Sequence, residues 1–283
     1  MPGDAAQGRV LSRQCWAIVA SHRGLIAFPS TSLACCLGVG ILLGTLAILS
    51  FSRSAILGLA CVVVLIIVLV AIDTVSSAAL VVATEQVLVE GRVGVSDAWR
   101  GALAALGPLV IWSWIRAGVG SALSVVRGDA TQQSGGLLLR GVISAAGGVA
   151  WGIVTFFVVP VLVLERVRPM AAIRRSASLA RDRWGSQLRG TVRIGALVGV
   201  TIVLPAIVLV LAGLALLADP GKAATWLGLP CLALGAIGVI TGAIITGTLR
   251  GVFSVVLYRY ATNGTGEGGF TATELQAAFG AGH

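Results

Sequence analysis

The densest group of charged side chains in this 283-residue chain is an arginine-rich segment between residues 166 and 193, with eight arginines and no lysine. Cationic side chains close to a membrane surface attract anionic lipid by about 1 kcal/mol each. The segment therefore predicts a site for anionic lipid headgroups, made of Arg174, Arg175, Arg181, Arg183 and Trp184. The alternative is that these arginines only fix the topology of the chain and brace its helices.

Helical spacing in this segment predicts an amphipathic helix. At 100° per residue, Arg174 and Arg181 flank an apolar stripe and Arg175 points away from it. Pro169 suits the first turn of such a helix. A basic amphipathic helix with a tryptophan on its apolar side is expected to lie in the plane of the headgroups. The predicted stripe consists of Met170, Ile173, Ala177, Ala180, Trp184 and Leu188.

Two charged residues, Asp73 and Arg116, lie within apolar runs. A lone arginine inside a bilayer costs roughly 3 kcal/mol on insertion scales, so Arg116 is expected to find a partner or to reach the interface. Asp73, in the preceding run, is the natural partner. The pair could relay protons or ions, or it could be a structural salt bridge. Relays generally use several carboxylates or histidines, and both histidines of this chain lie outside the runs; we therefore favour the bridge.

Pro160 lies within another apolar run, about one turn before its end. A proline there removes a backbone hydrogen bond and predicts a kink that neighbouring helices can accommodate. Such a kink could act as a hinge in a transporter or be a bend that fits the packing.

No motif for catalysis or metal binding is present. The sequence has no phosphate-binding loop, no H-E-x-x-H and no nucleophile elbow. Its five cysteines include no C-x-x-C pair and no metal-ligand spacing. We therefore expect no catalytic residue, no metal and no cofactor. An enzyme acting on lipid headgroups would need carboxylates close to the arginines, and Glu85, Glu90 and Asp97 are the candidates.

The elements that carry these residues are predicted to be transmembrane helices. Hydrophobic residues make up 57% of the chain and charged residues only 11%, against about 25% charged in soluble domains. A span needs roughly 20 apolar residues. The sequence predicts an all-α, polytopic integral membrane protein with six spans and cytoplasmic amphipathic helices. The spans are expected at about 30–51, 54–83, 107–126, 141–164, 192–217 and 228–257.

The distribution of arginine predicts the orientation of the chain. Most arginines lie in the tails and in the loops after the second and fourth spans, which by the positive-inside rule places both termini in the cytoplasm. The preference for arginine over lysine, with abundant Ala, Val and Gly, is typical of a GC-rich bacterium, so we expect the bacterial plasma membrane. A pI near 10.6 would also suit a nucleic-acid-binding protein, but the apolar runs contradict that interpretation.

The predicted organisation is a bundle over residues 1–261 followed by a tail. Interfacial helices are expected near 9–23, 96–106 and 169–189, and residues 262–283 are expected to form a flexible linker and a short cytoplasmic helix. Several pairs of glycines four residues apart favour close helix packing and allow a homodimer. These pairs are Gly40 and Gly44, Gly148 and Gly152, Gly195 and Gly199, Gly238 and Gly242, and Gly247 and Gly251.

Four short motifs carry a resemblance to a known family: WGIVTFFVVP at 151–160, AIRRS at 172–176, RWG at 183–185 and YRYA at 258–261. With them the chain resembles an uncharacterised bacterial family of six-span membrane proteins, from about residue 16 to residue 279. It is more distantly similar to the membrane domain of glycerophosphodiester phosphodiesterases. The resemblance implies a membrane bundle and supplies no catalytic residue. The soluble phosphodiesterase domain has no counterpart here, so hydrolase activity is not expected.

The function expected from these residues is non-enzymatic. The protein would organise lipid or a protein partner through its arginine-rich cytoplasmic face. The alternative is a transporter for a small solute or lipid, with Asp73 and Arg116 in its centre. A polar cavity near Arg116 would favour the transporter, and a closed apolar bundle with a basic cytoplasmic shelf would favour the first function.

Overall fold

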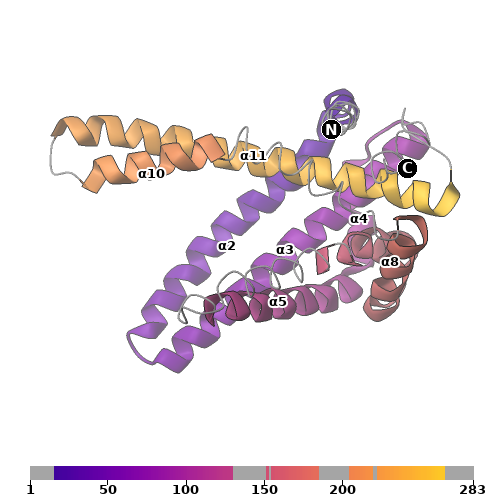
Figure 1. Ribbon diagram of the computed structural model, residues 1–283, viewed down its shortest axis with the longest axis horizontal. Coiled ribbons are helices and arrows are strands. Elements are labelled where there is room, and N and C mark those ends of the chain that lie inside the picture. The colour runs from indigo at the N-terminus through magenta and orange to yellow at the C-terminus, as the bar shows by residue number, and fades with distance from the viewer. Residues whose placement is uncertain (1–15, 130–150, 153, 185–203, 219–221, 265–283) are drawn as a thin grey trace.

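The computed structural model describes residues 16–129, 151–152, 154–184, 204–218 and 222–264, and all regular secondary structure in this part of the chain is helical. The all-α class predicted from the sequence is confirmed for these residues. After a helical segment at 16–21, the elements are η1 (Arg23–Ile26), α2 (Ala27–Phe51), α3 (Ala55–Glu90), α4 (Val95–Ala104), α5 (Leu106–Asp129), α7 (Val158–Leu164), α8 (Pro169–Trp184), α10 (Leu204–Ala218) and α11 (Lys222–Asn263) (Figure 1).

Several helices are long and apolar enough to cross a membrane. Within the described residues, three helices meet this condition, at Arg23–Phe51, Ala55–Glu90 and Trp226–Asn263. If the bent pair α4–α5 is counted as one span, the number of candidate spans is four. These helices indicate a membrane location. Of the six predicted spans, those at 141–164 and 192–217 fall partly outside the described residues. The described part of the first includes α7, of 7 residues, and that of the second lies within α10, of 15.

Prolines set where three of the helices begin. Pro29, Pro108 and Pro160 are each the third residue of their helix, α2, α5 and α7. The proline ring clashes with the carbonyl four residues earlier, while the first residues of a helix need no partner for their N–H groups. A break therefore precedes Pro108 and Pro160, whereas before Pro29 the η1 turn runs directly into α2. The break between α4 and α5 turns the chain by 72°, and the kink predicted at Pro160 is a turn at Phe156 and Phe157.

The α2–α3 hairpin has an apolar half and a packed half. Towards its tip at residues 52–54, large apolar side chains such as Ile41, Leu49 and Ile56 are exposed, which suits contact with lipid chains. Towards the other end, most residues of α3 from Ala78 to Val87 are buried, and the helix contacts α4, α5, α7 and α11. The core of the protein therefore lies at the end of the hairpin away from its tip.

Helices α10 and α11 form a second hairpin, which extends away from α2 and α3 as an arm (Figure 1). Glycines allow the two backbones to approach closely. A Cβ atom added to Gly235 would lie 2.7 Å from the backbone nitrogen of Val210, and a Cβ atom added to Gly213 would lie 2.7 Å from the backbone nitrogen of Leu232. Neither glycine belongs to the predicted pairs, but Gly238, which does, also faces α10, where an added Cβ atom would lie 2.8 Å from Cβ of Ala206. Gly40 and Gly44 instead face open space, because a Cβ atom added to either would meet nothing within 4 Å.

The end of α11 extends the bundle slightly beyond its predicted boundary. The helix continues through residue 261 to Asn263, because Tyr258, Tyr260 and Ala261 are buried against the core. The predicted linker and short helix fall mostly within residues 265–283, outside the described residues.

Candidate functional site

The arginine-rich helix is present as α8, which begins at Pro169 as predicted and packs against α5, α7 and α11. Its buried face consists of Ala172, Ser176, Leu179 and Ala180. The predicted stripe was therefore wrong in part, because Met170 is 59% exposed and Leu179, which the stripe left out, is buried. Apart from Leu179, the side chains on this buried face are small, which allows α8 to approach the bundle closely.

Ser176 explains why this face of α8 is turned inward. The break before Pro160 leaves backbone groups of residues 154–157 without helical partners. The Ser176 hydroxyl donates to the carbonyl of Val154 and accepts a hydrogen bond of 3.2 Å from the N–H of Phe157. Ser176 itself is fully buried. The AIRRS motif thus supplies, from α8, hydrogen bonds to two backbone groups at the break that precedes Pro160.

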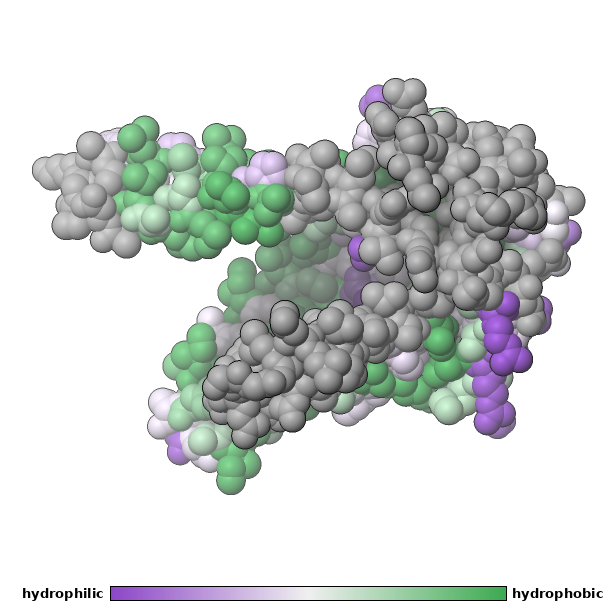
Figure 2. Space-filling view, viewed as in Figure 1, coloured by the Kyte–Doolittle hydropathy of each residue, from purple (hydrophilic) through white to green (hydrophobic). Residues whose placement is uncertain are grey.

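The opposite face of α8 carries exposed arginines. Arg174 and Arg181 are exposed, and neither forms an ion pair with any residue in the described ranges. They are seven residues apart, so they share one side of the helix and lie about 10 Å apart along its axis. Hydrophilic side chains gather over α8 in Figure 2. Arg166 and Arg168, just before the helix, are exposed as well.

The remaining members of the predicted lipid site are placed differently. Arg175 donates through Nε to the Glu165 carboxylate at 3.3 Å, so its charge is already compensated within the protein. Arg183 and Trp184 lie in the last turn of α8, but their side chains are outside the described part of the structure. Arg174 and Arg181 are thus the two predicted arginines that the structure leaves facing outward.

Partly buried polar contacts join the YRYA motif of α11 to the rest of the core. The Tyr258 hydroxyl donates to Glu165 at 2.9 Å, and Arg259 forms an ion pair with Glu85 of α3. Sequence reasoning did not identify these pairs, although the motif contained one partner of each. The contacts fix the end of α11 to α3 and to the segment that precedes α8.

The three carboxylates considered for headgroup chemistry do not form a cluster. Glu85 pairs with Arg259, Glu90 with Arg92 and Asp97 with Arg100, so each is engaged by a separate arginine. No group of three or more metal-binding side chains occurs among the residues that the structure describes.

Asp73 and Arg116 form the predicted ion pair. The Nη1 atom of Arg116, on α5, donates to Oδ2 of Asp73, on α3, at 2.8 Å. The pair forms because α3 continues as a helix to Glu90, which places Asp73 in its middle rather than at its end. The Asp73 side chain is 50% exposed and the Arg116 side chain 45%, so each still has free surface.

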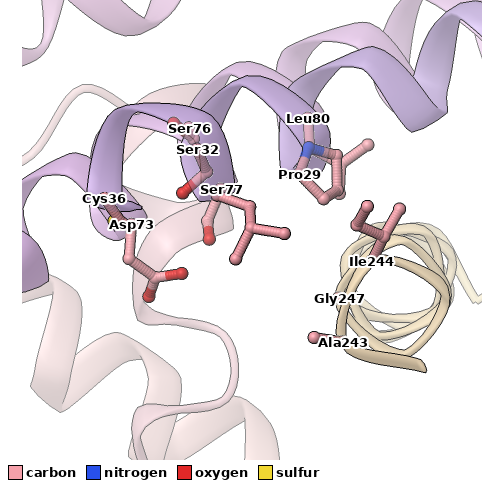
Figure 3. Close-up of a pocket in the computed structure, with 11 residues that line it drawn as sticks. Pro29, Ser32, Cys36, Asp73, Ser76, Ser77, Leu80, Ala243, Ile244 and Gly247 are labelled. Carbon is pink, nitrogen blue, oxygen red and sulfur yellow. The ribbon is translucent and has the colours of Figure 1, made fainter. Parts of the chain in front are cut away.

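Asp73 also lines a pocket of about 190 Å³ between α2, α3 and α11 (Figure 3). Its polar lining is completed by Ser32, Cys36, Ser76 and Ser77. Sequence reasoning missed the pocket, although Ser76 and Ser77 follow Asp73 by three and four residues, the spacing that places side chains on one face of a helix. The contribution of α11 could not be seen from local spacing.

Comparison with known proteins identifies a family. Residues 56–270 match DUF6159, a family of unknown function. No curated protein matches the chain, and no solved structure does. The match agrees with the uncharacterised family expected from the motifs, and the distant similarity to phosphodiesterase membrane domains stays a prediction.

Proposed function

The chain belongs to DUF6159, a family of unknown function, and we propose that it is a non-enzymatic membrane protein that binds anionic lipid headgroups through the outer face of α8. The observation that carries the proposal is the exposure of Arg174 and Arg181 on a helix whose opposite face is buried. In the proposed arrangement the protein lies in the bacterial plasma membrane, with α8 and both termini on the cytoplasmic side, as the positive-inside rule predicts.

The way in which α8 is held supports binding by these arginines. Ser176 and the buried side chains around it fix the rotation of the helix. The guanidinium groups of Arg174 and Arg181 are therefore directed away from the protein without competition from a described carboxylate. Arg175, the residue after Arg174, differs from these two arginines because it already forms an ion pair with Glu165.

The expected strength follows from the number of free arginines. At about 1 kcal/mol for each arginine near an anionic surface, Arg174 and Arg181 together contribute about 2 kcal/mol. A free energy of 1.4 kcal/mol corresponds to a factor of ten in affinity. Replacing both arginines should therefore weaken binding of anionic lipid by about 30-fold.

Thermal unfolding in detergent tests the proposal. Phosphatidylglycerol should raise the melting temperature of the wild-type protein, and the double variant Arg174→Gln/Arg181→Gln should lose most of that increase. Arg53→Gln is the matched control, because Arg53 is exposed at the tip of the α2–α3 hairpin, far along the chain from α8. Equal stabilisation of all three proteins would refute the site on α8.

A protein partner is the other ligand that this surface suits. Acidic side chains of a partner, or of a second copy of the chain, would pair with the same arginines. In that case the double variant would lose a co-purifying protein or a dimer and keep its response to phosphatidylglycerol.

A second candidate function is a transporter for a small solute or lipid, with Asp73 and Arg116 in its centre. The observation that favours it is the pocket beside Asp73. A transporter must expose this pocket alternately to the two sides of the membrane. A membrane-impermeant maleimide should then reach Cys36, which lines the pocket, from both sides of sealed vesicles. Labelling from one side alone would argue against transport.

A further inference from the structure

Two serine hydroxyls in the Asp73 pocket differ from most other hydroxyls in the helices. Ser and Thr side chains within helices usually donate to a carbonyl of the preceding turn, and Ser30, Thr74 and Thr84 do so here. Ser76 and Ser77, by contrast, make no hydrogen bond to any described residue. Both line the pocket, so their hydroxyl groups are available to a ligand.

The Asp73 carboxylate is also only partly used. Arg116 donates to its Oδ2 atom, and no described residue donates to Oδ1. In Figure 3 the Asp73 and Ser77 side chains point from α3 into the space beside Ala243, Ile244 and Gly247 of α11. The pocket therefore offers a carboxylate oxygen and hydroxyl groups at one end and apolar side chains opposite them.

The position of the pocket along α3 matches the headgroup boundary of a membrane. Asp73 lies 18 residues after Ala55, the first residue of α3, which is about 27 Å along a helix. The hydrocarbon core of a bilayer is about 30 Å thick. If the hairpin tip, with Arg53, lies at one surface, then Asp73, Ser76 and Ser77 lie close to the other. A polar ligand at this depth reaches the pocket from the headgroup layer rather than from the centre of the membrane.

The size and surroundings of the pocket suit part of a lipid. Its volume of about 190 Å³ is comparable with a cavity of roughly 150 Å³ that admits benzene, so it holds a headgroup but not acyl chains. Figure 2 shows a hollow between the α10–α11 arm and the α2–α3 hairpin, with apolar side chains along the arm. Acyl chains could lie along these apolar helices while the headgroup occupies the pocket.

We infer that the Asp73 pocket binds the headgroup of a membrane phospholipid that ends in a hydrogen-bond donor, either an ammonium or a hydroxyl group. The donor group bonds to the free oxygen of Asp73 and to the hydroxyls of Ser76 and Ser77. Arg116 balances the charge of Asp73 and holds the carboxylate in place, so the ligand need not carry a net positive charge. The inference concerns a site separate from the arginines of α8 and does not depend on them.

Native mass spectrometry with three phospholipids tests this inference. Phosphatidylethanolamine has an ammonium donor, phosphatidylglycerol has hydroxyl donors, and phosphatidylcholine has a headgroup without a donor. The wild-type protein should retain one molecule of the first or second lipid more tightly than phosphatidylcholine. Equal retention of all three would refute selection by hydrogen-bond donors.

Two variants and a matched control assign the binding to the pocket. Ala243→Phe should fill the pocket and abolish the selective retention. Ala236→Phe adds the same ring at an exposed position of α11 that does not line the pocket, and it should behave like the wild type. Asp73→Asn keeps the shape and an acceptor for Arg116 but loses the charge, so it should weaken binding of phosphatidylethanolamine about tenfold, since hydrogen bonds to charged groups are stronger.

A measurement on the wild-type protein avoids any loss of folding. Cys36 lines the pocket, whereas its neighbour Cys35 is exposed. Phosphatidylethanolamine should protect Cys36, but not Cys35, from alkylation by N-ethylmaleimide. Unchanged alkylation of Cys36 would overturn the inference. The double variant Arg174→Gln/Arg181→Gln should keep this protection, so failure of the α8 site and failure of the pocket can be told apart.

Discussion

Replacing Ser176 with alanine should destabilise the protein more than most single substitutions. The change removes the hydroxyl that bonds to the carbonyl of Val154 and to the N–H of Phe157. A buried polar group left without a partner costs about 1–3 kcal/mol, and two groups lose their partner here. We expect a loss of about 3 kcal/mol. At about 2–4 °C per kcal/mol for a protein of this size class, the melting temperature should fall by about 6–12 °C.

The assay is thermal unfolding of purified protein in detergent, followed by the loss of helical circular dichroism. Ser178→Ala is the control, because Ser178 lies on the same helix but donates only to the carbonyl of Arg175. Its melting temperature should change by about 1–2 °C at most, as expected for a substitution outside the core. If Ser176→Ala were as stable as Ser178→Ala, the account of how α8 is held against the break before Pro160 would be wrong.

Three further predictions concern packing and charge. Gly235→Ala should lower the melting temperature by an amount corresponding to about 1–3 kcal/mol, because the new Cβ atom would lie 2.7 Å from the backbone of α10. Gly44→Ala is the control and should not lower the melting temperature, because Gly44 faces open space. Asp73→Ala should reduce the yield of folded protein because Arg116 loses its partner, and the double variant Asp73→Ala/Arg116→Ala should restore it; no recovery would refute a structural pair. Tyr258→Phe should cost about 1.5 kcal/mol in chemical unfolding, the lower end for a hydrogen bond to a charged group, and an unchanged stability would show that this contact is not formed.

Features with a local cause could be predicted from the sequence. Apolar runs of membrane-spanning length identified α2, α3 and α11, because helix length and hydrophobicity are properties of a single segment. The start of α8 at Pro169 follows from the fixed backbone angle of proline. The pairing of Asp73 with Arg116 could be expected because a charge within an apolar run needs a partner.

Features that depend on packing between distant segments could not be predicted. The buried face of α8 was misjudged because hydrophobicity alone assigns Met170 inward, whereas the hydrogen bonds of Ser176 to the preceding helix decide the rotation. The pairing of Glu165 with Tyr258 joins residues 93 positions apart. The pocket beside Asp73 depends on α11, which approaches α2 and α3 only in the folded protein.

The most direct test of the central claim, that α8 binds anionic lipid, is native mass spectrometry of the protein gently extracted from its own membrane. The wild type should carry anionic lipid that the double variant Arg174→Gln/Arg181→Gln has lost, while the control Arg53→Gln retains it. An equal amount of anionic lipid on all three proteins, or none on the wild type, would contradict the claim and leave the outward arginines with a role in topology alone.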